Sequence, residues 1–163
     1  MCAAFARTAG PRLRGAAGWL AAVAALLAAL SWSPAAATAQ ASDKPFVEHR
    51  LALQLSDRTP EKQALVISVA NNLLKFYGPD KVAIEVVTFG PGIDLLLADS
   101  PYRSQVDSLV SQGVQFDVCM NTVETIERRT GQRPALNPKA VPVEAGVAQI
   151  LALTEKGYTL VRP

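Results

Sequence analysis

Cysteine and histidine are almost absent from this sequence of 163 residues, which has two cysteines, Cys2 and Cys119, and one histidine, His49. Two cysteines are too few for the disulfide framework of a small secreted domain. One histidine and no C-x-x-C pair leave no ligand set for a structural zinc site. His49 lies at the start of an expected strand and is interpreted as a solvated surface residue. We therefore expect no metal centre.

The glycine-rich motifs of many α/β enzymes are also missing. The chain has no G-x-x-x-x-G-K-[ST] phosphate loop and no G-x-S-x-G nucleophile elbow. The turn after the first expected strand, residues 56–61, contains no glycine and cannot form the G-x-G-x-x-G loop of a dinucleotide site. We expect no bound cofactor.

Acidic residues are lacking in the first 40 positions, which hold sixteen alanines and three arginines. All 14 acidic residues lie beyond, where they outnumber the basic residues by one. The net charge of +2 therefore comes from the N-terminal segment, and the rest of the chain is nearly neutral. A nearly neutral body argues against binding to nucleic acid or to an anionic membrane.

The N-terminal segment has the pattern of a secretory signal. Its arginines precede an uncharged apolar run of fifteen residues, from Ala16 to Leu30. This run is shorter than the roughly 20 residues that span a bilayer. Ala37 and Ala39 form an A-x-A cleavage site. We predict a signal peptide over residues 1–39, cut after Ala39, then a linker over 40–47 and one domain over 48–163.

Two alternatives stay open for this segment. Ala35-Ala36-Ala37 is a competing cleavage site, and an uncleaved segment would act as an anchor. The body is exported in each case, and the leader has a bacterial pattern, so we expect the protein in the periplasm. Cleavage would leave no membrane segment and would leave Cys119 as the only cysteine.

Beyond residue 47, apolar periodicities predict alternating strands and helices. Leu51, Leu53 and Leu55 alternate as in a strand, and Val82–Phe89 is the nearly continuous apolar run of a strand buried on both faces. The expected strands are 49–55, 82–89, 114–119, 141–143 and 158–161, and the expected helices begin at 60, 93, 101, 121 or 122, and 144. This alternation predicts an α/β fold with a parallel sheet.

The last two expected helices carry residues whose orientation or role the sequence indicates. In the last one, residues 144–156, we expect four apolar side chains to face inward: Val147, Ile150, Leu151 and Leu153. Near the end of the preceding helix, Arg128 and Arg129 are interpreted as cations that balance the helix dipole.

Cys119 closes the third expected strand and precedes a helix. Ligands meet parallel sheets at the carboxyl ends of their strands, and the free N–H groups of a helix N-terminus stabilise a thiolate. We expect Asn121 and Thr122 to cap that helix and support the thiolate. The other interpretation is that Cys119 only packs in the core, as buried cysteines usually do.

Two loops are expected to lie at the same edge of the sheet as Cys119. Gly90-Pro91-Gly92 ends the second strand and Ser56-Asp57 ends the first. If the second and third strands are neighbours, the glycine-proline loop lies beside Cys119. We expect Ser56, Asp57, Gly90, Pro91 and Gly92 to line the site.

Three segments resemble proteins of the DsrE/DsrF-like sulfur-relay family: residues 114–122 around Cys119, the loop 89–93, and the C-terminal residues 141–163. Their order and spacing along residues 48–163 carry the resemblance. It implies a three-layer α/β/α sandwich with a five-stranded parallel sheet in the order 4-3-2-1-5. It also implies that Cys119 accepts sulfane sulfur as a persulfide and passes it to a partner protein.

Two features depart from the family's pattern. The best-understood members are cytoplasmic, whereas this chain carries an export signal. No second cysteine remains to resolve a persulfide, so its release requires a thiol from a partner.

The implied strand order bears on assembly. The first three crossovers would place their helices on one face of the sheet, and the fourth would place its helix alone on the other face. A second copy would cover the thinly protected face, so we expect a homo-oligomer.

Two functions stay open at this point. One is a sulfur carrier, rather than an enzyme with turnover, in which Cys119 holds the sulfur. The other is a non-catalytic module that binds a small ligand or serves assembly, with Cys119 as a packing residue. A soft-metal site of Cys119 and Met120 has too few ligands in one chain and would need a subunit interface.

Overall fold

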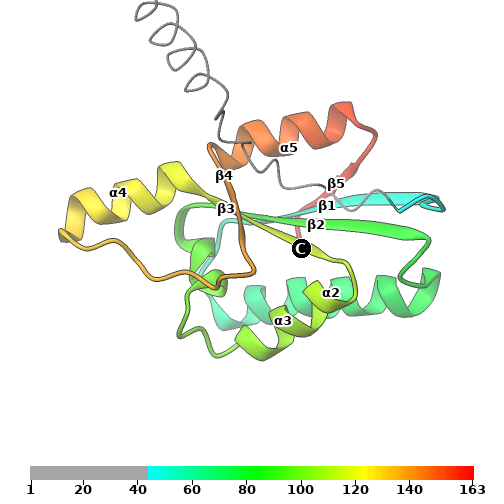
Figure 1. Cartoon of the computed structure of the whole chain (residues 1–163), viewed down its shortest axis with the longest axis horizontal. Helices are drawn as coiled ribbons and strands as arrows, with labels where there is room; N and C mark the ends of the chain where they lie inside the picture. Colours follow the sequence, from blue (N-terminus) through cyan, green and yellow to red (C-terminus); the bar gives the residue numbers. More distant parts are fainter. Residues whose placement is uncertain (1–43) are drawn as a thin grey trace, which may run out of the picture. The chain divides into compact units, whose positions relative to one another are not determined.

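The computed structural model describes residues 44–163, and Figure 1 shows their arrangement. The predictions for the signal peptide, its cleavage after Ala39 and most of the linker concern residues outside this range. Five parallel strands form one sheet in the order β4-β3-β2-β1-β5, which confirms the predicted fold class and strand order. The strands are β1 (His49–Leu55), β2 (Val82–Thr88), β3 (Gln115–Cys119), β4 (Val141–Val143) and β5 (Thr159–Val161).

The connections between the strands are helical. They are α2 (Pro60–Tyr77), the 3-10 helix η2 (Gly90–Leu96), α3 (Arg103–Ser111), α4 (Met120–Thr130) and α5 (Gly146–Glu155). The first helix begins at Pro60 as predicted, because the ring of proline fixes a helical φ and its missing N–H costs nothing in the first turn. No helix within residues 44–163 combines the length and the apolar character needed to cross a bilayer.

The helices expected from 93, 101 and 144 begin at Gly90, Arg103 and Gly146, and the predicted start after β3 was wrong as well. The helix after β3 begins at Met120 and not at Asn121 or Thr122, so Cys119 itself is the N-cap residue. Its backbone is still extended, with φ −71° and ψ 113°, and no side chain caps the helix. Strand and helix therefore join without a loop, and the thiol sits directly at the helix N-terminus.

The two faces of the sheet differ in character. Helices α2 and α3 cover one face, as Figure 1 shows, and this face carries large apolar side chains. Leu53, Ile84 and Phe116 are among its fully buried members. Burying each such side chain stabilises the fold by about 1.5–3 kcal/mol. This layer is the main hydrophobic core.

Helix α5 lies alone over the opposite face (Figure 1), where the buried cluster is small: Ala52, Val87, Ile150 and Leu153. Val147 and Leu151 are 65% and 60% exposed, so the prediction that they face inward was wrong. Gly146, Ile150 and Leu153 follow each other at helical spacing and occupy the face toward the sheet. A single helix packs on one side only, so the neighbouring stripe is left in solvent.

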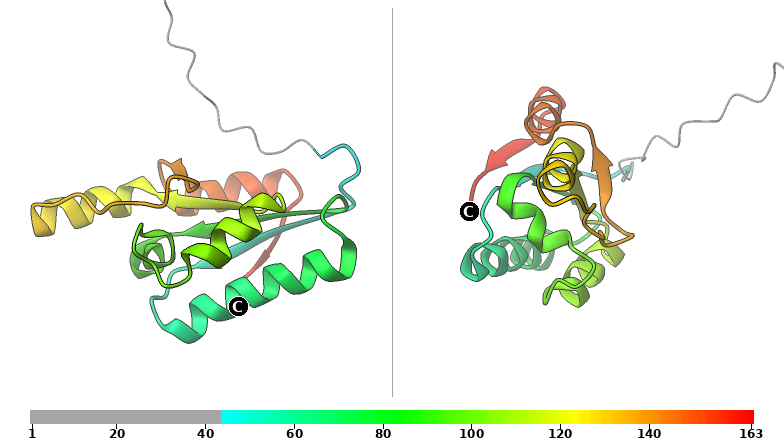
Figure 2. Two further views of the ribbon diagram at one scale, coloured as in Figure 1. Left: turned by 60° about the horizontal axis from the view of Figure 1, so that its bottom comes forward. Right: turned by 90° about the vertical axis from the view of Figure 1, so that its left-hand side faces the viewer.

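Helix α4 does not lie over the sheet with α2 and α3, contrary to the expected placement of the first three crossovers. Figure 2 shows that it extends outward from the carboxyl edge of the sheet, beyond β3. Its side chain Val123 is fully buried, and Met120 and Ile126 pack against the main core. The helix is therefore anchored by its first two turns, and the rest projects from the edge where Cys119 lies.

Candidate functional site

The thiol of Cys119 lies between the starts of two helices. Cys119 is the last residue of β3 and the N-cap of α4, and its side chain is 5% exposed. It points to the α5 face of the sheet, because it shares its face with Asp117 two residues earlier. Helix α5 begins nearby at Gly146, and Sγ lies 4.0 Å from the carbonyl oxygen of Glu144.

Burial by itself raises the pKa of the Cys119 thiol, but hydrogen bonds to the sulfur outweigh this effect. The Thr122 side chain and the backbone N–H groups of Gly146, Thr122 and Asn121 favour the charged form of the sulfur, so the pKa of the thiol lies below its usual value. The Asn121 N–H also donates to the Glu144 carbonyl at 3.2 Å. These donors come from both helix N-termini, where N–H groups have no partner within the helix. They favour the thiolate, the nucleophilic form of cysteine.

Gly146 allows α5 to start this close to the cysteine. A Cβ at this position would lie 3.3 Å from Cβ of Cys119 and 3.1 Å from Cβ and Cδ1 of Phe89. Both contacts are tighter than ordinary van der Waals distances. The absence of a side chain therefore lets the Gly146 N–H reach the sulfur.

Thr122 connects the thiol to the loop after β2. Its hydroxyl oxygen accepts a hydrogen bond of 3.0 Å from the N–H of Gly90, and the same side chain helps to lower the pKa of the Cys119 thiol. Gly90 has φ +53°, a left-handed conformation that suits glycine. The loop and the helix start that the sequence placed together are thus in direct contact.

The other residues of the expected site lie farther out. A Cβ on Gly92 would lie 2.2 Å from the Leu55 carbonyl oxygen, so Gly92 serves the close packing of η2 against the end of β1. Ser56 is half-buried on the far side of Gly90, with its carbonyl oxygen 4.0 Å from where a Gly90 Cβ would be. Asp57 is exposed.

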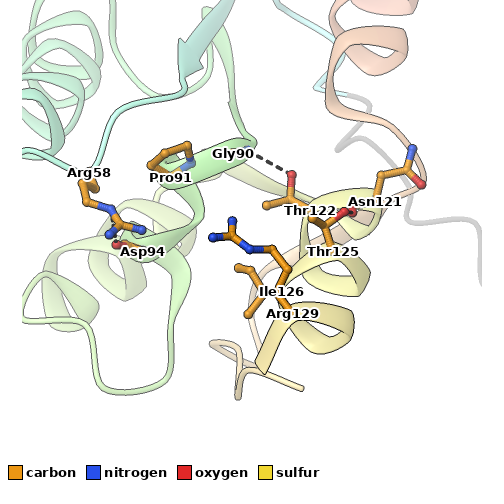
Figure 3. A pocket seen from close by; sticks show the side chains of 9 residues that line it. All are labelled: Arg58, Gly90, Pro91, Asp94, Asn121, Thr122, Thr125, Ile126 and Arg129. Atoms are coloured by element: carbon orange, nitrogen blue, oxygen red, sulfur yellow. Dashed lines mark hydrogen bonds and ion pairs between the residues drawn. The ribbon is translucent and has the colours of Figure 1, made fainter. Parts of the chain in front are cut away.

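A pocket of about 360 Å³ opens between η2 and α4 (Figure 3). It includes Gly90, Pro91, Asn121 and Thr122 of the expected site. Cys119, Gly92, Ser56 and Asp57 do not line it. Its full lining is Arg58, Gly90, Pro91, Asp94, Asn121, Thr122, Thr125, Ile126 and Arg129.

Sequence reasoning missed the charged residues of this pocket. Arg129 was interpreted as a dipole-balancing cation, yet its side chain reaches into the pocket from α4 (Figure 3). Arg58 enters from the opposite wall, where its Nε lies 3.3 Å from Oδ2 of Asp94. One sequence signal was available, because Thr122, Thr125 and Arg129 follow at helical spacing and share one face of α4.

A second polar cluster lies under α5, away from the pocket. Glu85 on β2 and Asp117 on β3 are both buried, and the Gln149 amide donates to each of them at 3.3 Å. Gln115 donates to Asp117 at 2.8 Å. Burial is the main cause that raises the pKa of Asp117 to about 7, and the nearby Glu85 carboxyl adds to it. Burial and Glu85 also raise the pKa of Tyr158.

Within the described part of the chain, no three histidine, cysteine or acidic side chains come close enough together to hold a metal ion. His49 is exposed and stacks against Tyr77, with ring centroids 4.0 Å apart. Its placement agrees with the interpretation as a surface residue.

Comparison with protein-family models and with curated proteins gives no match to this chain. Among solved structures, the chain is similar to MTH1491 from Methanobacterium thermoautotrophicum, described as a protein of unknown function. The TM-score is 0.64 at 28% sequence identity, over 71% of this chain and all of that one. The likeness supports the α/β fold with its five-stranded parallel sheet and names no activity.

Proposed function

We propose that this protein is a sulfur carrier of the DsrE/DsrF-like kind, in which Cys119 accepts sulfane sulfur as a persulfide and yields it to a partner. The observation that carries the proposal is the place of Cys119, which is the N-cap residue of α4 and lies beside the start of α5 at Gly146. N–H groups from the starts of α4 and α5, together with the Thr122 hydroxyl, lower the pKa of the Cys119 thiol despite its burial. Packing alone does not require such an arrangement.

The proposed step needs no external oxidant. The Cys119 thiolate attacks the outer sulfur of a donor R–S–SH. A new S–S bond forms to Cys119, the S–S bond of the donor breaks, and R–S⁻ leaves with the electron pair. The transferred sulfur keeps its oxidation level. A partner thiolate then attacks the outer sulfur of Cys119–S–SH in the same way and regenerates the Cys119 thiolate.

Both the donor and the acceptor of the transferred sulfur must be other molecules. The only other cysteine of the sequence is Cys2, which the expected cleavage removes. A resolving thiol must therefore come from a partner protein or a small molecule.

Intact-protein mass spectrometry of the exported, mature chain tests the proposal. The chain is incubated with a polysulfide, next to a Cys119→Ser variant, and then treated with reductant. We expect a gain of whole sulfur atoms that requires Cys119 and disappears on reduction. A wild-type protein that gains no sulfur although it is folded would overturn the proposal. The mass before treatment also tests the proposed periplasmic signal, which predicts a chain that begins at Gln40.

A second function has an observation in its favour. Cys119 is 5% exposed and lies near the ring of Phe89, as a packing residue would. In that case the protein is a binding or assembly module of the same fold. A thiol that reacts with a neutral alkylating reagent only after unfolding would support this function over the carrier.

We further propose that the protein forms a homo-oligomer through α5. This helix covers its face of the sheet alone and presents Val147 and Leu151 to solvent. A second copy seated on this stripe would remove the exposed apolar surface from water.

A further inference from the structure

We infer that the pocket between η2 and α4 binds the anionic group of a small molecule, with Arg129 and Arg58 as the cationic groups that hold it. Cys119 does not line this pocket, and its side chain points to the α5 face of the sheet. The proposed function identifies the physiological anion as a negatively charged sulfane donor, and only this identity rests on that function. Anion binding itself does not depend on sulfur transfer.

The charges in the pocket do not cancel. Two guanidinium groups enter from opposite walls, Arg58 from the turn after β1 and Arg129 from α4 (Figure 3). The one carboxylate in the lining, Asp94, is paired with Arg58 at 3.3 Å. Arg129 has no carboxylate within 4.0 Å among residues 44–163. The pocket therefore keeps one positive charge without a partner, on a side chain that offers a fork of N–H donors.

Neighbouring arginines differ from Arg129 in this respect. The Arg128 guanidinium donates to the hydroxyl of Thr125, a lining residue, at 2.9 Å, and Arg133 pairs with Glu127 at 2.6 Å. Neither lines the pocket. Of these three cations, only Arg129 combines a place in the pocket with a free guanidinium. It is therefore the residue on which the inference depends most.

The size and the walls of the pocket fit a small molecule. A volume of about 360 Å³ lies at the lower end of the range of small-molecule sites. Pro91 and Ile126 form apolar walls beside the two arginines. Guanidinium groups bind oxoanions and carboxylates with paired hydrogen bonds, and such bonds are stronger beside apolar walls. A small oxoanion and a small carboxylate share this chemistry.

The pocket also has a structural link to the thiol. The Thr122 hydroxyl oxygen accepts a hydrogen bond from the N–H of Gly90, both residues line the pocket, and Thr122 lies in the first turn of the helix that begins after Cys119. An anion held by Arg129 would therefore lie on the same helix as the N-cap cysteine. This would raise the local concentration of an anionic donor near the cysteine.

Anion titration of the Cys119→Ser chain tests the pocket without any sulfur chemistry. Sulfate and succinate are titrated in separate arms at low ionic strength, which distinguishes an oxoanion from a carboxylate ligand. The same titrations are made with Arg129→Gln added and with the matched control Arg128→Gln, which removes the same charge from the same helix end. We expect saturable binding that Arg129→Gln weakens about tenfold and Arg128→Gln changes by less than about twofold. No binding of either anion, or equal loss in the two variants, would overturn the inference.

Two alkylating reagents with the same reactive group test the link to Cys119. Iodoacetate is anionic and iodoacetamide is neutral, and both need the thiolate, so the ratio of their rates is insensitive to the pKa of Cys119. We expect Arg129→Gln to lower the iodoacetate-to-iodoacetamide ratio about threefold or more and Arg128→Gln to leave it unchanged. An unchanged ratio in Arg129→Gln would overturn the link.

The two hypotheses can fail separately. If the polysulfide adds sulfur to Cys119 but no anion binds, the carrier stands and the anion site falls. If sulfate or succinate binds through Arg129 but Cys119 never gains sulfur, the anion site stands and the carrier falls.

Discussion

The N–H of Gly90 donates a hydrogen bond of 3.0 Å to the hydroxyl oxygen of Thr122. This bond joins the loop after β2 to the first turn of α4, 32 residues later in the chain. The same Thr122 side chain helps to lower the pKa of the Cys119 thiol. A backbone group of one loop thus helps to set the protonation of a thiol on the next strand.

Replacement of this hydroxyl should make the thiol less acidic. Thr122→Val keeps the shape of the side chain but removes its hydrogen bond to the sulfur, so the pKa of Cys119 should rise. We expect iodoacetamide to react with Cys119 up to about tenfold more slowly at pH 7. In the wild type, the midpoint of the rate against pH should lie below about 8.5, the ordinary value for cysteine.

Thr122→Ser is the matched control, because it keeps the hydroxyl and loses only a methyl group. Its midpoint should stay near that of the wild type. If valine and serine give the same midpoint, the Thr122 hydroxyl does not tune the thiol.

A methyl group on Gly146 should disturb the start of α5. The Cβ of Gly146→Ala would lie 3.1 Å from Phe89 and 3.3 Å from Cβ of Cys119, so one of these side chains or the helix start must give way by a few tenths of an ångström. We expect a loss of about 1–3 kcal/mol in the free energy of unfolding, measured by urea denaturation. The pKa of Cys119 should also rise, since the Gly146 N–H moves away from the sulfur.

A smaller side chain at residue 89 provides the control for this crowding. In a Phe89→Ala background, Gly146→Ala should cost less than it does alone, and the double-mutant cycle measures the difference. Strictly additive costs would show that the two positions do not compete for the same space.

The carboxyl of Asp117 should make stability depend on pH. Its pKa is raised from 3.8 to about 7 in the folded protein, mainly by burial, so the folded state binds the proton more tightly than the unfolded chain. The contribution to stability is complete below pH 4 and is lost as the pH rises through about 7. Between pH 4 and pH 8 we expect the free energy of unfolding of the wild type to fall by on the order of 1 kcal/mol or more because of this carboxyl. Asp117→Asn should not show this part of the fall.

Urea denaturation at several pH values measures this dependence for wild type and Asp117→Asn. The exposed Asp57 supplies the control, because Asp57→Asn removes a carboxyl that the fold does not bury. The hypothesis fails if the difference in unfolding free energy between wild type and Asp117→Asn stays constant over the range.

A charge on the outer face of α5 should separate the copies of the proposed oligomer. Leu151 is 60% exposed, so Leu151→Asp should leave the fold intact, as judged by circular dichroism. Light scattering at micromolar concentration should give a multiple of the chain mass for the wild type and a lower mass for the variant. Phe76→Asp on α2, where the side chain is 79% exposed, is the control and should not change the mass. A wild-type protein with the mass of one chain would contradict the proposal.

The sequence predicted the sheet well because each strand has a recognisable pattern of apolar residues over a few neighbouring positions. Val82–Phe89 is an apolar run that is followed by Gly90. Strand β2 ends at Thr88, one residue before the end of this run. The alternation of Leu51, Leu53 and Leu55 sets one face of β1 against the main core. Such patterns depend on neighbours in the chain, so they can be recognised without the fold.

The orientation of α5 could not be predicted in the same way. Val147, Ile150, Leu151 and Leu153 form a broad apolar stripe, and either half of it could face a sheet. Ile150 and Leu153 are buried because the sheet offers room beside Ala52 and Val87. This choice depends on the far strands and not on the helix itself.

The pocket, like the orientation of α5, could not be predicted without the fold. Arg58 and Arg129 meet because the turn after β1 and the helix after β3 both lie at the carboxyl edge of the sheet. The sequence places both at that edge. It does not show that α4 projects outward and so turns Arg129 back toward η2 (Figure 3).

The unequal burial of the helices has a consequence for hydrogen exchange. Helix α2 buries Gln63, Val66, Ile67, Ala70 and Leu74, whereas α5 buries only Gly146, Ile150 and Leu153. Detaching α5 therefore exposes less apolar surface than detaching α2. The amide protons of α5 should exchange by a partial opening, whereas those of β2 should exchange only on global unfolding. Such an opening removes the cover over Cys119 and leaves the main core intact. The free energy of this local event, rather than that of the whole domain, then sets how often the Cys119 thiol is exposed to solvent.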